Sequence, residues 1–86
     1  MSPSSEVPVV LPAALHARPA GAVVRAASAF TATVEIRHGE KAAGARSALR
    51  LMSLGADAGT TVIVHADGDD AAAAAEAVAE ALRTAT

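Results

Sequence analysis

The 86-residue sequence contains no cysteine, no tryptophan and no tyrosine, and Phe30 is its only aromatic residue. Without cysteine the chain has no disulfide, no thiolate metal site and no thiol redox chemistry. Because large aromatic side chains are scarce and 25 residues are alanine, the core must be thin and aliphatic. A formal net charge of −2 provides no general attraction to nucleic acid or to anionic membranes. Partners of these two kinds are therefore not expected.

Long apolar runs are also missing from the chain. The longest, residues 71–75, is far too short to span a membrane. The first five residues lack the basic start and the apolar stretch of a signal peptide. Because a chain of this length has room for only one core, we expect a single domain over residues 1–86 that is cytoplasmic and monomeric. Residues 1–5 and 84–86 are expected to be loose ends.

Hydrophobic periodicity predicts four strands and three helices. Val7, Val9 and Leu11 alternate, and Pro8 among them cannot donate a sheet hydrogen bond, which favours an edge strand. Further strands are expected over residues 31–38, 41–45 and 60–66, and helices over residues 17–29, 48–54 and 71–83. The order is β-α-β-β-α-β-α. We expect an α+β fold in which three helices cover one face of an antiparallel sheet and the other face meets solvent.

A histidine stands where the first predicted strand has ended and the first predicted helix begins, in the run Leu15-His16-Ala17-Arg18-Pro19-Ala20. The positive end of the helix dipole disfavours the imidazolium, so a neutral, nucleophilic ring is expected near pH 7. Unpaired amides at a helix start can bind a phosphate, and the Arg18 guanidinium suits phosphate oxygens. From these residues alone, a capping histidine without chemistry is an equally good interpretation.

Two motifs resemble those of the HPr family, the histidine-containing phosphocarriers of the bacterial phosphoenolpyruvate-dependent sugar phosphotransferase system. One is the run over residues 15–20, and the other is residues 46–55, a regulatory serine followed by a short helix and M-S-L-G. Phe30 at the end of the first helix and residues 59–62 at the last strand extend the resemblance over residues 7–82. The resemblance implies an open-faced β-sandwich with the sheet order 1-4-2-3.

The resemblance also implies a role for each residue of the first motif. Nδ1 of His16 would accept a phosphoryl group from enzyme I and pass it to the A domain of a sugar permease. Arg18 and the backbone amides of Ala17 and Arg18 would stabilise that group. The chain would be a covalent carrier and not a turnover enzyme, with no cofactor and no metal. Because a carrier must also release the group, we expect His16 to be exposed.

The second motif implies further sites around its short helix. Ser47 matches the serine that a dedicated kinase phosphorylates in some bacteria, and it is also the expected N-cap of the helix. Leu51 and Leu54 are expected to face the core. The family's partner-binding surface corresponds to an apolar centre with a basic rim, which suits transient complexes with acidic partners. Its residues in this chain are Arg25, Ala48, Leu49, Arg50 and Met52.

The sequence departs from the family pattern just before the histidine, where Ala13-Ala14 replaces the common Asn-Gly pair. Ser28 stands where some members have lysine, and Gly21 stands where alanine is common. The other titratable residues have no expected chemistry: His38 and His65 lack ligand-like neighbours, and Asp67, Asp69 and Asp70 are expected to be turn and cap residues.

Two alternative functions stay open at this point. One is a related carrier with the same chemistry in a nitrogen-related or other regulatory phosphorelay. The other is a noncatalytic module that binds a phosphate or carboxylate reversibly at the helix start, without a covalent product.

Overall fold

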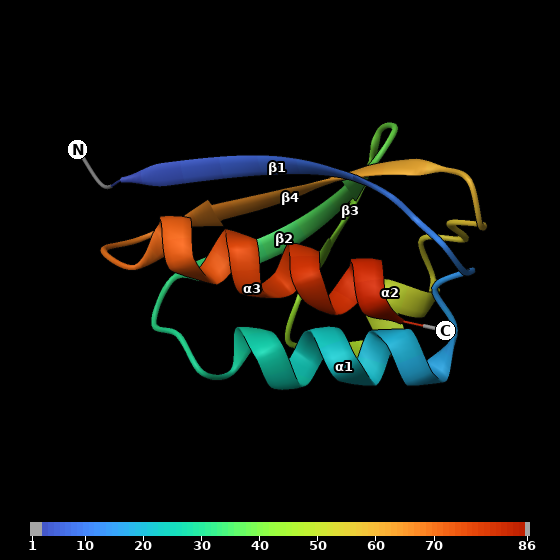
Figure 1. Ribbon diagram of the computed structural model, residues 1–86, viewed down its shortest axis with the longest axis horizontal. Coiled ribbons are helices and arrows are strands. Elements are labelled where there is room, and N and C mark those ends of the chain that lie inside the picture. Colours follow the sequence, from blue (N-terminus) through green and yellow to red (C-terminus); the bar gives the residue numbers. More distant parts are fainter. Residues whose placement is uncertain (1–2, 86) are drawn as a thin grey trace.

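The computed structural model describes residues 3–85, which form a sheet and a layer of helices on one face of it (Figure 1). The strands are β1 (Ser4–Val10), β2 (Thr33–His38), β3 (Lys41–Gly44) and β4 (Thr61–Asp67), and the helices are α1 (Ala17–Ala27), α2 (Ala48–Met52) and α3 (Ala71–Thr84). The sheet is antiparallel in the order β1-β4-β2-β3. The predicted fold class and the strand order implied by the family resemblance are both confirmed.

Strand β1 lies at the edge of the sheet and pairs with β4, as Pro8 predicted. Proline is tolerated there because its nitrogen can point away from the neighbouring strand. The expectation of loose ends is wrong for Ser4 and Ser5, which pair with β4 through their backbones, and for Thr84, which is the last residue of α3. Pro3 is also held, since its carbonyl accepts the amide of Gly68 at 2.9 Å, and Ala85 is the C-cap residue of α3. Residues 1–2 and 86 lie outside the described residues.

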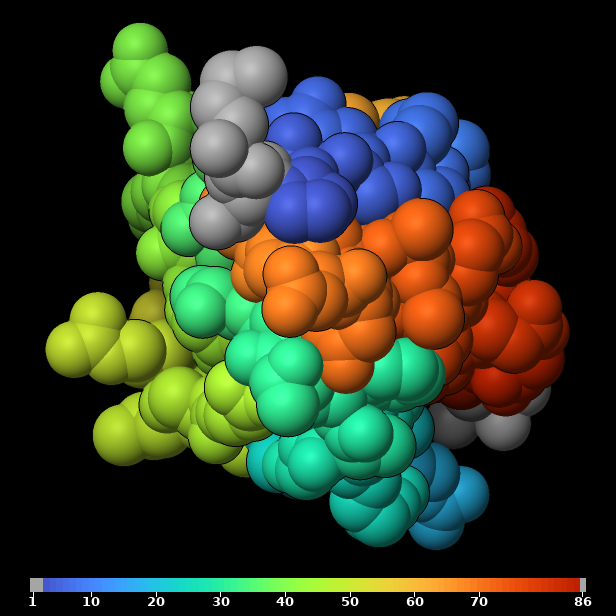
Figure 2. Space-filling view, turned by 90° about the vertical axis from the view of Figure 1, so that its left-hand side faces the viewer, coloured from blue at the N-terminus to red at the C-terminus, as the bar shows by residue number. Residues whose placement is uncertain are grey.

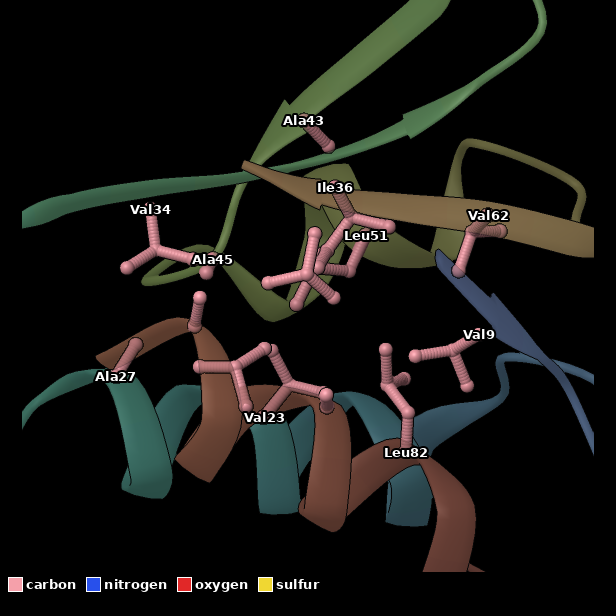
Figure 3. Packing of buried hydrophobic residues seen from close by; sticks show 14 of the residues in the cluster. Val9, Val23, Ala27, Val34, Ile36, Ala43, Ala45, Leu51, Val62 and Leu82 are labelled. Atoms are coloured by element: carbon pink, nitrogen blue, oxygen red, sulfur yellow. The ribbon is translucent and has the colours of Figure 1, made fainter. Parts of the chain in front are cut away.

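An aliphatic core fills the space between the sheet and the helices (Figure 3). The strands contribute Val9, Val34, Ile36 and Val62, and the helices contribute Val23, Leu51 and Leu82. Nearly half of the buried residues are alanines, whose small side chains let α1 and α3 approach each other closely. Phe30 lies at the border of this core and is only partly buried. The thin aliphatic core predicted from composition is confirmed.

Helix α1 ends at Ala27, two residues earlier than its periodicity predicted. Ser28 turns its hydroxyl back and donates to the carbonyl of Val24 at 2.7 Å. The guanidinium of Arg46 donates to the carbonyls of Ala27 (3.2 Å) and Phe30. The carbonyls of Val24 and Ala27 also accept the backbone amides of Ser28 and Phe30, so these side chains add donors at the end of the helix.

Asp70 occupies the N-cap position of α3, but its carboxylate makes no capping hydrogen bond with that helix. Its two oxygens instead accept the amides of Thr31 (2.9 Å) and Ala32 (2.8 Å). The bond from Thr31, followed by partial desolvation that opposes it and the bond from Ala32, lowers the pKa of Asp70 below its ordinary value. The interpretation of Asp70 as a simple cap is therefore corrected, because it ties the loop before β2 to the start of α3.

The uncovered face of the sheet carries a charged network centred on His65. Its Nδ1 lies 2.9 Å from Oε2 of Glu6, and its Nε2 lies 2.8 Å from Oδ2 of Asp67. Arg37 donates to the same Glu6 oxygen at 3.0 Å and also to Glu35. Desolvation disfavours the charged ring, but the hydrogen bonds to Glu6 and Asp67 outweigh it and raise the pKa of His65. The imidazolium, which donates from both nitrogens, is the form that fits this network.

We expect this network to make the stability of the protein depend on pH. Because the pKa of His65 is higher in the folded chain than the ordinary histidine value of 6.5, its contribution to stability is fully present below pH 6.5. It is lost as the pH rises through the folded-state pKa, and it amounts to no more than about 1 kcal/mol because the carboxylates are half-exposed. The measurement is thermal unfolding of the wild type and of His65→Gln, from below pH 6.5 to above the folded-state pKa of His65. The difference between their midpoints should shrink as the pH rises, and a constant difference would contradict the expectation.

Candidate functional site

His16 occupies the N-cap position of α1, with an extended backbone at φ −86° and ψ −169°. Its carbonyl accepts the amide of Ala20 at 2.9 Å, which closes the first turn of the helix. Its ring makes no capping hydrogen bond, and the residue is exposed. The predicted position and exposure of His16 are thus confirmed, and a purely capping role for its ring is not what the structure shows.

Two backbone amides are free at this end of α1, those of Ala17 and Arg18. The amide of His16 donates to the preceding loop at 2.8 Å, and Pro19 has no amide hydrogen. The first helical hydrogen bond comes from Ala20, so among the described residues Ala17 and Arg18 have no backbone acceptor. The first turn also contains no acidic residue. Two donors and the positive end of the helix dipole therefore lie beside the imidazole.

The loop that carries His16 is held by the segment that follows α2. The amide of Leu15 donates to the carbonyl of Ala56 at 3.0 Å, and the Leu15 side chain is buried. Among the described residues no position other than glycine has a positive φ, so Ala13 and Ala14 occupy this loop without backbone strain. The Ala13-Ala14 replacement therefore leaves His16 on an anchored loop.

Three arginines lie on α1 and on the neighbouring α2: Arg18 in the first turn of α1, Arg25 in its last turn, and Arg50 in α2. Arg18, Arg25 and Arg50 are exposed, and within residues 3–85 none of them takes part in a salt bridge. Arg25 lies back along its helix, because its Nη1 is 3.5 Å from the place where Gly21 would carry a Cβ. The segments Ala17–Ala27 and Ala48–Met52 contain no acidic residue. Their positive charge is therefore available to an external group.

Helix α2, which contains Arg50, also presents an apolar surface, and side chains of this yellow-green segment project from the molecule in Figure 2. Leu49 is 77% exposed and Met52 is 38% exposed, whereas Ala48 is half-buried. Leu51 and Leu54 are buried, as predicted. We call Ala48, Leu49 and Met52 the α2 patch. Large exposed apolar side chains are rare elsewhere, since Val10 is the only other one in the described part of the chain.

Ser47 is the N-cap of α2, as the sequence predicted. Its hydroxyl oxygen accepts the amide of Arg50 at 3.3 Å, and its own amide donates to the carbonyl of Gly44 at 3.2 Å. The residue is half-buried at the border of the α2 patch. A capping bond of this kind explains a serine at this position without any modification.

Sequence reasoning missed two side chains that contact the segment around α2. Arg46 donates to the end of α1, and Nδ1 of His38 lies 3.2 Å from the carbonyl oxygen of Leu54. The partners lie 16 to 19 residues away along the chain, so no local pattern could have indicated them. The sequence indicated no chemistry for His38, and it did not reveal this structural contact.

An exposed imidazole at a helix start with free amides, in an open-faced sandwich, is the arrangement expected of a histidine phosphocarrier. The chain belongs to the HPr family, because the family model described as the "PTS HPr component phosphorylation site" matches residues 3–84. The predicted phosphocarrier function, as opposed to that of a turnover enzyme, is confirmed for the family to which the chain belongs.

Individual relatives agree with this assignment. The chain is 36% identical over 73 residues to the phosphocarrier protein HPr of Haemophilus influenzae, covering 85% of this chain and 86% of that one. It is 42% identical over 65 residues to a multiphosphoryl transfer protein of Xanthomonas campestris, covering 76% of this chain but 8% of that much longer protein. The crystal structure of HPr from Bacillus anthracis superposes with a TM-score of 0.85 at 30% identity, covering 93% and 98% of the two chains.

In the described part of the chain, the helices are too short or too polar to cross a membrane.

Proposed function

We propose that Nδ1 of His16 is the phosphoryl acceptor of this chain, that enzyme I is the donor, and that the A domain of a sugar permease is the recipient. The observation that carries the proposal is the exposed, uncapped His16 ring beside two free amides. The Nδ1 lone pair attacks phosphorus, a P–N bond forms, and the bond from phosphorus to the donor breaks. The ring proton stays on Nε2, so no separate general base is required.

The surroundings of His16 suit a group that must be both held and released. The amides of Ala17 and Arg18 can donate to phosphoryl oxygens, and the exposed Arg18 guanidinium can add a charged donor. Interactions of this kind contribute about 0.3–1 kcal/mol each at an exposed helix end. Stabilisation on this scale favours the phosphorylated state but still allows the phosphoryl group to be released, as a carrier requires.

The absence of an enclosed site supports a protein as the donor and a protein as the recipient. No pocket is present among residues 3–85, so a small-molecule substrate would find no enclosing surface. The α2 patch, with Arg25 and Arg50 around it, offers instead a small apolar centre and a positive rim. We propose that this surface docks acidic faces of enzyme I and of the permease domain.

Ser47 is proposed as a regulatory site on the same surface, for a serine kinase and phosphorylase where the host has them. Its hydroxyl borders the α2 patch, so a phosphate there would add about two negative charges to a surface that is otherwise basic. That charge would repel the acidic partners proposed above.

The test is phosphorylation of the purified chain by enzyme I, Mg²⁺ and phosphoenolpyruvate, read by intact mass. We expect one acid-labile phosphoryl group on the wild type and on His65→Gln, and none on His16→Ala. A phosphoryl group retained by His16→Ala would refute the assignment of the acceptor. A wild type that enzyme I from the same organism leaves unmodified would favour a regulatory phosphorelay or the reversible anion-binding module.

A further inference from the structure

Helix α2 is too short to hold its own position. It spans five residues, Ala48–Met52, and an isolated helix of that length is not stable in water. Leu51 is its one fully buried residue, and the half-buried Ala48 packs against the same core. The rest of the helix is exposed, so contacts at its two ends add to this anchor in setting the orientation of the α2 patch.

At the N-terminal end, Arg46 links the α2 segment to α1. One nitrogen of its guanidinium, Nη2, donates to the carbonyls of Ala27 (3.2 Å) and Phe30, which lie at and just beyond the last turn of α1. A cation at a helix C-terminus is favoured by the dipole as well as by these hydrogen bonds. Because Ser47 follows Arg46 directly, this contact places the start of α2 relative to α1.

At the C-terminal end, His38 links the same segment to the sheet. Nδ1 of its ring lies 3.2 Å from the carbonyl oxygen of Leu54, and a carbonyl can only accept, so Nδ1 carries the proton. Two residues further on, the carbonyl of Ala56 accepts the amide of Leu15, the residue before His16. The contact of His38 thus joins the end of α2 to the segment that holds the loop with Leu15 and His16.

We propose that His38 and Arg46 are positioning residues that keep the α2 patch oriented relative to His16 for the docking of phosphoryl donor and recipient. Neither residue is at the acceptor ring, so neither takes part in the transfer itself. The inference rests on the proposed function, because it concerns the surface that this function assigns to partner proteins.

The exposure of Arg46 and His38 distinguishes a positioning role from a contribution to folding stability alone. Arg46 is exposed and His38 is half-buried, whereas Leu51 and Leu54 are 0% and 3% exposed. Hydrogen bonds at the surface contribute little net stability. Loss of either contact should therefore loosen α2 while the core keeps the chain folded.

The first test compares His38→Leu with His38→Asn, whose side-chain amide can place a donor near the position of Nδ1. Steady-state phosphoryl transfer from enzyme I is measured with each chain as the varied substrate. For His38→Leu we expect KM to rise about fivefold, the effect of one ordinary hydrogen bond, with kcat unchanged. His38→Asn should restore KM to within about twofold of the wild type. An unchanged KM in His38→Leu, or an equal rise in both variants, would overturn the role of His38.

The second test compares Arg46→Met with Arg46→Lys, which keeps the positive charge. Arg46→Met should raise KM at low and at high ionic strength, because the lost contact is a hydrogen bond to backbone and not only a charge. Arg46→Lys should lie between Arg46→Met and the wild type, and equal KM values for Arg46→Met and the wild type at high salt would overturn the role of Arg46.

Backbone amide exchange in the same variants reports on α2 directly. Residues of α2 should exchange faster in His38→Leu and Arg46→Met, while those of α3 keep their wild-type rates. Uniformly faster exchange would indicate general destabilisation and contradict the positioning role. These outcomes are separate from the proposed function, which fails if the wild type accepts no phosphoryl group or if His16→Ala still accepts one.

Discussion

Arg18→Glu is expected to slow phosphorylation of His16 about thirtyfold. The substitution removes a charged donor to the phosphoryl oxygens and places a carboxylate in their path. Loss of one exposed donor costs up to about 1 kcal/mol, and repulsion between the new carboxylate and the phosphoryl oxygens adds a similar amount. Together these raise the activation free energy by about 2 kcal/mol, which corresponds to a factor of about 30. Arg18 is exposed and takes part in no salt bridge among residues 3–85, so the fold should not be affected.

The thermal stability of the same variant is an independent measurement, because we expect it not to fall when the reaction rate falls. A carboxylate in the first turn of a helix is favoured by the dipole, so the thermal midpoint of Arg18→Glu should stay at or slightly above that of the wild type. Lys41→Glu, at the exposed first residue of β3, makes the same change in net charge away from α1 and serves as the matched control. Rates are measured by quenched-flow mass spectrometry. Equal slowing in both variants would mean that net charge, and not the site, controls the reaction.

Gly68→Ala is expected to lower the free energy of unfolding by about 2–4 kcal/mol, the largest effect on stability that we predict. Gly68 has φ +137°, a conformation that side chains other than glycine rarely adopt. A Cβ there would lie 2.9 Å from the Cα of Ala32, so backbone on both sides would have to move. The amide of Gly68 also donates to the carbonyl of Pro3 at 2.9 Å, which ties the start of β1 to this turn.

Gly21→Ala provides the matched control, since it adds the same methyl group at a second glycine. Gly21 lies inside α1, and the only contact within 4 Å of its Cβ position is Nη1 of Arg25, at 3.5 Å. Alanine has the higher helix propensity, so this variant should gain up to about 1 kcal/mol. Urea unfolding of both variants measures the two changes. A loss of stability in Gly21→Ala, or none in Gly68→Ala, would contradict this account.

Local patterns along the chain were sufficient to predict most of the elements and the start of the site. Pro8 indicated an edge strand because its missing amide hydrogen is a property of the residue itself. Ser47 was correctly predicted as a helix cap because its acceptor role involves a backbone amide three residues away. His16 was placed correctly because the period of apolar residues changes from strand-like to helix-like around it.

Interactions between distant segments were not predictable in this way. Asp70 looked like a helix cap, but its carboxylate binds amides 38 and 39 residues earlier in the chain. Ser4 and Ser5 looked like part of a loose end because polar side chains give no hydrophobic signal, yet their backbones complete the β1–β4 ladder. Backbone hydrogen bonding across a sheet does not depend on side-chain polarity, so composition could not reveal it.

The amino-acid sequence was enough to determine the order of elements, the aliphatic core and the motif that contains His16, because these follow from short-range periodicity and from residue chemistry. Family membership follows from the same motifs. Only the tertiary structure decided that Arg46 and His38 contact the two ends of the α2 segment, and that the carbonyl of Ala56 holds Leu15 beside His16. These features depend on distances between segments far apart in the chain, which are set when the helices pack on the sheet.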